Sequence, residues 1–153
     1  VAKIETPSGS GFTLTLVATP ARFRHALEGD QRLVLAPGLR DPCLDVYPMQ
    51  AWEELERKVA ARPRLDRDIV LFRRRYISAA VECDLDKHGR VLVPAHLRSH
   101  AAMTKEAGDK EVLWAGVGTN MELWSRSRWD QAQALSEEDL DRWTQAVAEK
   151  LEL

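Results

Sequence analysis

The sequence has few cysteines and no long apolar run. Its two cysteines, Cys43 and Cys83, are far apart and lack C-x-x-C spacing, which excludes a disulfide framework and a zinc knuckle. No apolar stretch approaches the roughly 20 residues that a transmembrane helix needs, and the first residues lack the apolar region of a secretory signal. We therefore predict a cytoplasmic protein with no membrane partner, in which both cysteines act as small buried hydrophobic residues.

A strong excess of one charge is also missing. The formal net charge is −2, whereas proteins that coat nucleic acid without specificity are usually strongly basic. The charges are unevenly distributed, because residues 62–75 carry six Arg and two Asp, a net +4, and residues 136–153 carry two basic and six acidic side chains, a net −4. A basic region and an acidic tail can therefore coexist on one chain.

No catalytic signature is present: there is no H-E-x-x-H, no G-x-S-x-G and no phosphate-binding glycine loop. His96 and His100, four residues apart with Cys83 and His88 nearby in sequence, leave a metal site as an alternative hypothesis. A histidine pair at this spacing is more often a surface or packing feature. We predict no enzyme activity, no cofactor or metal and no small-molecule substrate.

The sequence does contain enough apolar residues for a core and, near the middle of the chain, a segment with the pattern of a polar-tipped hairpin. With 44% apolar residues, the 153-residue chain can bury a core, as one domain or as two small lobes. In Cys83–Pro94 two apolar runs flank a short polar stretch with one glycine, which predicts a strand, a tight turn, a second strand and a helix that begins at the proline. The tip carries Asp86, Lys87, His88 and Arg90, although an ordinary surface hairpin would look the same.

Periodicity predicts the other elements. Alternation and proline positions indicate strands at Phe12–Val17, Arg32–Pro37 and Cys43–Tyr47, a short helix at Ala21–Leu27, and a helix after Pro48 with Trp52, Leu55 and Val59 on one face. A further helix is predicted for Leu65–Ala80, with Arg73, Arg74 and Arg75 along its sides. An arginine triplet is usually a solvated helix face, and secondary phosphate contacts are the alternative.

The C-terminal helix has a recognisable start. Ser136 is a favourable N-cap, three acidic residues follow it, and Leu135 with Leu140 forms a hydrophobic staple. Its apolar stripe consists of Leu140, Trp143, Val147 and Leu151. We expect this stripe to pack on the body of the protein or on a neighbouring subunit.

The chain contains an internal duplication. Pro94–Arg98 resembles Pro20–Arg24 at an offset of 74 residues, and Met121–Trp129 resembles Leu44–Trp52 at an offset of 77. A three-residue insertion in the turn at Gly108–Lys110 would explain the change of offset. The predicted organisation is a first half at residues 1–63, a connecting helix at 64–80, a second half at 81–130 and a C-terminal helix at 131–153.

These repeated segments resemble the MraZ family of bacterial transcription factors. The matching stretches are Asp41–Pro48 with Trp52, Glu82–Arg98, Thr104–Glu106, and Glu122–Trp124 with Trp129. The resemblance covers about Pro20 to Asp130. It implies an α+β fold of two tandem AbrB-like swapped-hairpin β-barrel half-units with short helices, followed by the C-terminal helix.

The resemblance also implies a function. Family members bind double-stranded DNA at direct repeats upstream of a cell-division and cell-wall gene cluster, as a ring-shaped homo-oligomer, which would associate this chain with the nucleoid. They normally carry one D-x-x-x-R motif in each half. Here the second motif is intact as Asp86–Arg90, but Phe12–Leu16 replaces the first motif with apolar residues and Thr. Either the first half has lost its DNA contacts, or the oligomer reads DNA through one lobe per subunit.

Each residue of the intact tip has a predicted role. Arg90 offers a planar fork to a phosphate or a guanine edge, and Lys87 and a protonated His88 add phosphate contacts. Asp86 holds Arg90 or caps the turn, and Gly89 supplies a positive φ. The alternative function is an oligomeric protein-interaction scaffold that has lost DNA binding, which the altered first motif and the net acidity favour.

Overall fold

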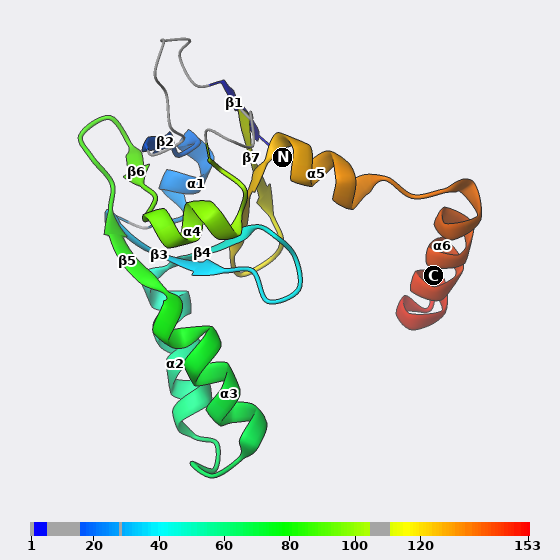
Figure 1. The fold of residues 1–153 in the computed structure, drawn as a ribbon, viewed down its shortest axis with the longest axis horizontal. Coiled ribbons are helices and arrows are strands. Elements are labelled where there is room, and N and C mark those ends of the chain that lie inside the picture. Colours follow the sequence, from blue (N-terminus) through cyan, green and yellow to red (C-terminus); the bar gives the residue numbers. More distant parts are fainter. Residues whose placement is uncertain (1, 6–15, 28, 105–110) are drawn as a thin grey trace.

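The computed structural model describes residues 2–5, 16–27, 29–104 and 111–153 (Figure 1). Its elements in chain order are β1 (Ala2–Glu5), β2 (Leu16–Ala18), α1 (Ala21–His25), β3 (Arg32–Pro37), β4 (Leu44–Pro48), α2 (Met49–Ala60), α3 (Arg67–Arg75), the 3₁₀ turn η1 (Ile77–Ala79), β5 (Val81–Asp84), β6 (Arg90–Leu92), α4 (Ala95–His100), β7 (Glu111–Gly116), β8 (Met121–Ser125), α5 (Arg126–Gln133) and α6 (Glu137–Leu151). This combination of helices with antiparallel sheets confirms the predicted α+β class.

Strands from both halves of the sequence alternate in the sheets. The larger sheet has six strands in the order β1-β7-β8-β4-β3-β5, and β2 pairs with β6 in a separate two-stranded sheet. The hairpins β3–β4 and β7–β8 meet at the centre, where Asp45 of β4 lies opposite Glu122 of β8. Val17 and Val91 are partners across β2 and β6, and both are fully buried. The two halves therefore share one core.

The element bounds refine the predicted duplication. The helix α4 follows α1 by 74 residues and β8 follows β4 by 77, as the sequence suggested, but β7 follows β3 by 79. The segment from α4 to β7 is therefore five residues longer than the segment from α1 to β3. The β7–β8 hairpin is two residues shorter, from the start of one strand to the start of the next, than the β3–β4 hairpin. Gly108–Lys110, where a three-residue insertion was expected, lies outside the described residues, as do residues 12–15 of the first predicted strand.

The two cysteines differ in their surroundings. Cys43 is 1% exposed, as predicted, whereas Cys83 is only partly buried against the main core. Burial raises the pKa of both thiols, that of Cys83 to about 11, so both are neutral near pH 7. Both residues contribute as apolar packing groups rather than as nucleophiles.

The helices α2 and α3 form an arm that extends from the sheet (Figure 1). Trp52 of α2 and Tyr76 after α3 are buried, and Phe72 stacks on Tyr76 with ring centroids 4.9 Å apart. The helix predicted for Leu65–Ala80 was too long at both ends: α3 begins at Arg67 and ends at Arg75, the 3₁₀ turn η1 follows, and Leu65 before the helix is 92% exposed. The helix begins later because Asp66 caps it by accepting hydrogen bonds from the amides of residues 68 and 69 at 2.9 and 3.2 Å.

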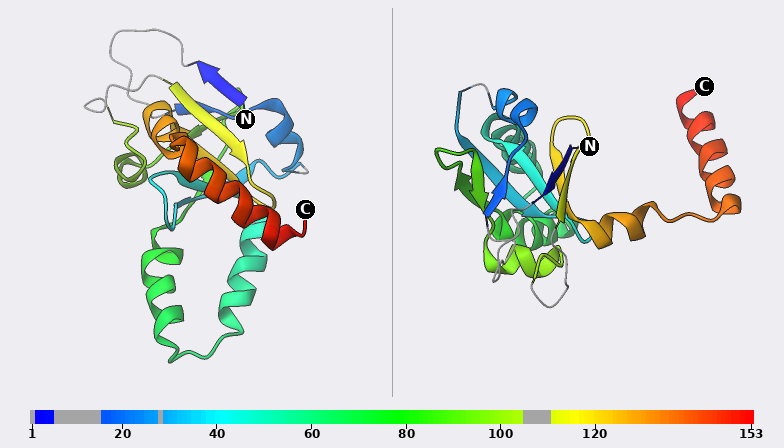
Figure 2. Two further views of the ribbon diagram at one scale, coloured as in Figure 1. Left: turned by 90° about the vertical axis from the view of Figure 1, so that its right-hand side faces the viewer. Right: turned by 90° about the horizontal axis from the view of Figure 1, so that it is seen from above.

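The helix α6 stands away from the sheets at the end of α5 (Figure 2). The predicted cap is confirmed, since the Ser136 hydroxyl accepts a hydrogen bond from the Asp139 amide at 3.1 Å. None of the residues of α6 is buried. Among the described residues, no helix has the length and apolar composition required to cross a membrane.

Candidate nucleic-acid interface

The connection between β5 and β6 is a tight turn closed by backbone hydrogen bonds. The Gly89 amide donates to the Asp86 carbonyl at 2.9 Å, and the Asp86 amide donates to the Arg90 carbonyl at 2.8 Å. Gly89 has φ of +71°, which confirms the predicted positive φ. Lys87 and His88 lie at the apex with exposed side chains. The turn is therefore a defined platform for two exposed basic side chains.

Asp86 organises this turn with its carboxylate. Its Oδ1 accepts the amides of His88 at 2.8 Å and Arg90 at 3.0 Å, and its Oδ2 accepts Arg90 Nε at 2.8 Å. Asp86 therefore makes the contacts of both predicted alternatives, since it binds the Arg90 side chain and caps the turn. Within the described residues, the two Nη atoms of Arg90 have no hydrogen-bonding partner, and its side chain is 43% exposed. The guanidinium is held through one edge, and its terminal nitrogens remain available to an external acceptor.

The strands on either side of the turn belong to different sheets. The strand β5 pairs with β3, whereas β6 pairs with β2, and only the bridge between Leu85 and Val91 joins the two strands directly. The predicted simple hairpin is therefore correct in its turn but wrong in its pairing. Because β2 and β3 both lie in the first half, the tip of the second half is held on each side by a strand of the first half.

The first half of the chain also contacts the tip. The Thr19 amide donates to the Gly89 carbonyl at 2.8 Å. The side chain of Arg24 crosses Gly89 so closely that a Cβ at this position would lie 2.8 Å from Arg24 Cδ. Arg24 is exposed and lies in the last turn of α1, which also carries Arg22 and His25. Arg24 therefore adds a guanidinium group beside the tip.

Arg24 was overlooked as a site residue. Its segment Pro20–Arg24 was recognised as one copy of a repeat, but no role was predicted for the arginine. Its counterpart Arg98 donates to the Val93 carbonyl at 2.8 Å. The repeat shows that an arginine recurs at this position in both copies, but only the spatial contact with Gly89 places Arg24 at the tip.

The other predicted arginines lie on the arm, away from the tip (Figure 1). Arg73 is partly buried and donates to the Val59 carbonyl at the end of α2 at 3.0 Å. Arg74 and Arg75 are exposed. The structure does not bring these three residues together with Lys87, His88 and Arg90.

Of the altered first motif, Phe12–Leu16, the structure describes only the last residue. Phe12 to residue 15 lie outside the described residues, and Leu16, which occupies the expected arginine position, begins β2. It pairs with Leu92 of β6, and the two side chains are 39% and 56% exposed. At this position the first half therefore presents an apolar side chain.

The histidines of the alternative metal hypothesis are not assembled. The ring nitrogen Nε2 of His96 lies 3.1 Å from the Ala79 carbonyl. In the described ranges, the side chains close enough to share an ion are instead Cys43, Asp45 and Glu122, whose candidate ligand atoms lie within 4.8 Å of one another. Two of these groups already have protein partners: Asp45 accepts from the Tyr76 hydroxyl at 2.6 Å, and Glu122 accepts from Trp124 Nε1 at 2.9 Å. We interpret the cluster as a polar network that joins the arm to the central strands.

The pH dependence of the tip follows from Asp86. The Arg90 amide, together with the Arg90 guanidinium and the His88 amide, lowers the pKa of this carboxyl below 3.8. A lowered pKa in the folded state means that the turn is stabilised above the ordinary carboxyl pKa and loses this stabilisation as the pH falls through the folded value. A carbon-detected NMR titration should place the Asp86 midpoint below 3.8. Arg90→Gln keeps the backbone donor, so it should raise the Asp86 midpoint only part of the way to the ordinary carboxyl value. A midpoint at the ordinary value in the parent chain would contradict the described geometry.

Sequence comparisons agree with one another. Residues 76–150 match a family model described as "MraZ protein, putative antitoxin-like". The chain is 45% identical over 130 residues to a protein of Moorella thermoacetica, covering 80% of this chain and 85% of the relative. It is 46% identical over 112 residues to a protein of Heliobacterium modesticaldum, covering 73% of each. A protein of Desulforamulus reducens is 39% identical over 132 residues, covering 86% of this chain and 87% of the relative. All three are named "Transcriptional regulator MraZ".

Proposed function

Because the chain belongs to the MraZ family of transcriptional regulators, which is not a family of enzymes, we propose that it binds promoter DNA through the tip at Asp86–Arg90. The DNA is double-stranded and carries direct repeats upstream of a cell-division and cell-wall gene cluster. The protein acts as a ring-shaped homo-oligomer associated with the nucleoid. Transcription is regulated by occupancy of these repeats.

The observation that carries this proposal is the geometry of Arg90. Its Nε is bound to Asp86 Oδ2 at 2.8 Å, so the guanidinium plane is oriented before DNA arrives. A pre-oriented fork loses little side-chain entropy when it binds a phosphate or the O6 and N7 atoms of guanine. Lys87 and His88 at the apex, and Arg24 beside it, supply phosphate contacts that position the tip but do not read sequence.

The oligomer follows from the small size of the tip. A few phosphate contacts give weak, salt-sensitive binding near physiological ionic strength. Several tips on one ring convert later contacts into intramolecular steps, so affinity rises without new kinds of contact. Repeated DNA sites matched to repeated tips would supply the specificity.

Fluorescence anisotropy tests this proposal. A labelled duplex taken from the repeats upstream of the chain's own gene cluster should bind about 10³-fold or more tightly than a shuffled duplex of equal composition. Equal affinity for both duplexes would contradict sequence-specific binding. No binding to either duplex, with the oligomer intact, would support the protein-interaction scaffold.

A further inference from the structure

The helix α6 exposes an apolar stripe. Leu140, Trp143 and Leu151 are 46%, 56% and 63% exposed, and they lie at helical spacing on one side of the 15-residue helix. A helix of this length is marginal by itself in water, and most helical stability comes from packing an amphipathic face. A partner surface for this stripe is therefore expected.

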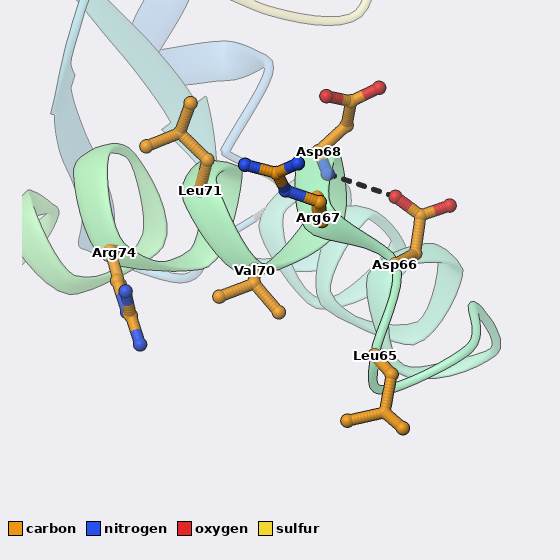
Figure 3. A pocket seen from close by; sticks show the side chains of 7 residues that line it. All are labelled: Leu65, Asp66, Arg67, Asp68, Val70, Leu71 and Arg74. Carbon is orange, nitrogen blue, oxygen red and sulfur yellow. Dashed lines mark hydrogen bonds between the residues drawn. The ribbon is translucent and has the colours of Figure 1, made fainter.

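A complementary surface lies on the arm. An open groove of about 820 Å³ follows α3 from Leu65, just before the helix, to Arg74 near its end, and Figure 3 shows the lining side chains. Its apolar lining consists of Leu65, Val70 and Leu71, of which Leu65 and Leu71 are 92% and 51% exposed. Two arginines, Arg67 and Arg74, and two aspartates, Asp66 and Asp68, also line it. The groove thus combines apolar side chains with charged groups of both signs.

The chain segments that carry the two surfaces have opposite net charges. Residues 62–75, which include the groove, have a net charge of +4, and residues 136–153, which include α6, have a net charge of −4. Opposite charges around matching apolar surfaces increase the association rate and fix the register of an interface. Contact between two copies of α6 would instead bring like charges together.

We propose that the apolar stripe of α6 docks into the α3 groove of a second copy of this chain. The helix does not occupy the groove of its own chain, because Figure 1 places α6 and α3 apart and only residues 134–136 join α6 to α5. Since the donor and acceptor surfaces differ, the contact is head-to-tail, and such contacts generate rings when the rotation between copies closes. The inference rests on the proposed oligomer but is independent of DNA contact by the tip.

Complementation between two variants tests this interface. Trp143→Asp damages the stripe and Leu71→Asp damages the groove; because both side chains are exposed, each variant should fold, as circular dichroism can verify. In light scattering, each variant alone should be monomeric. An equimolar mixture should form dimers only, because one intact stripe and one intact groove remain per pair. Leu39→Asp, at another exposed leucine (64%), should leave the parent oligomer unchanged.

Three outcomes would overturn the interface. Assembly of Trp143→Asp alone would show that the stripe is not needed, and assembly of Leu71→Asp alone would show pairing between copies of α6. A mixture that stays monomeric would exclude complementary surfaces. Anisotropy with the upstream duplex, measured on the same variants, separates these results from failure of the DNA-binding tip. A monomeric parent chain would remove both the proposed oligomer and this interface, while binding by single tips would still be detectable.

Discussion

Replacing Arg90 with alanine should weaken binding to the upstream repeats by about 10- to 100-fold for each engaged tip, because a bidentate arginine contact contributes roughly 1–3 kcal/mol. The loss should multiply when several tips of one oligomer bind together. Anisotropy titration of the parent and the variant measures the change. Light scattering should show the same oligomer for both proteins, since Arg90 lies on the tip and not on α3 or α6.

Arg126 offers a matched control for this substitution. Its Nε binds Asp130 Oδ2 at 3.0 Å, four residues along the chain, and its side chain is 45% exposed, compared with 2.8 Å and 43% for Arg90 and Asp86. Arg126→Ala therefore removes a similar ion pair at a site on α5, together with a longer one to Glu111 at 3.7 Å. It should leave DNA affinity nearly unchanged. If both alanine variants lose affinity equally, the effect comes from overall charge and the assignment to the tip is wrong.

Alanine at Gly89 should also impair DNA binding, by at least about tenfold, through the shape of the turn. A positive φ at a non-glycine residue costs about 1 kcal/mol. The added methyl group would also meet the side chain of Arg24, with Cδ 2.8 Å away. Either the turn or Arg24 must then move, and both carry proposed DNA contacts. Thermal unfolding and anisotropy measure the two consequences.

Gly29 separates backbone strain from steric conflict. It has φ of +87°, and nothing lies within 4 Å of a Cβ built on it. Gly29→Ala should therefore show the backbone cost alone, with a smaller loss of stability and normal DNA affinity. Adding Arg24→Ala to the Gly89 variant should restore part of the stability. Equal behaviour of the two glycine variants would contradict the packing of Arg24 against the tip.

Local features of the fold were predictable from sequence because local chemistry determines them. The proline at residue 94 precedes α4, Ser136 caps α6, and the turn at Gly89 has the φ that its glycine suggested. Strand β3 has the predicted bounds, Arg32–Pro37. The role of Asp86 was also accessible, because an aspartate four residues before an arginine across a tight turn is well placed to bind it.

Long-range pairing could not be read from the same patterns. Period-two alternation identifies a strand but not its partner, so the pairing of β6 with β2 rather than with β5 was missed. Arg24 was missed for the same reason, since it meets Gly89 from 65 positions away in the sequence. Leu65 was misassigned because its helical spacing from Ile69 outweighed the capping signal of Asp66.

The salt dependence of DNA affinity tests the central claim most directly. Anisotropy titrations of the upstream duplex between about 50 and 200 mM salt give the slope of log K against log salt, which reports the number of neutralised phosphates. If Arg90 at each tip binds a phosphate, Arg90→Ala should make the slope shallower by about one for each engaged tip; if it reads a base, affinity should fall with relaxed specificity. A parent slope near zero, or a variant identical to the parent in slope, affinity and specificity, would contradict DNA recognition by the tip.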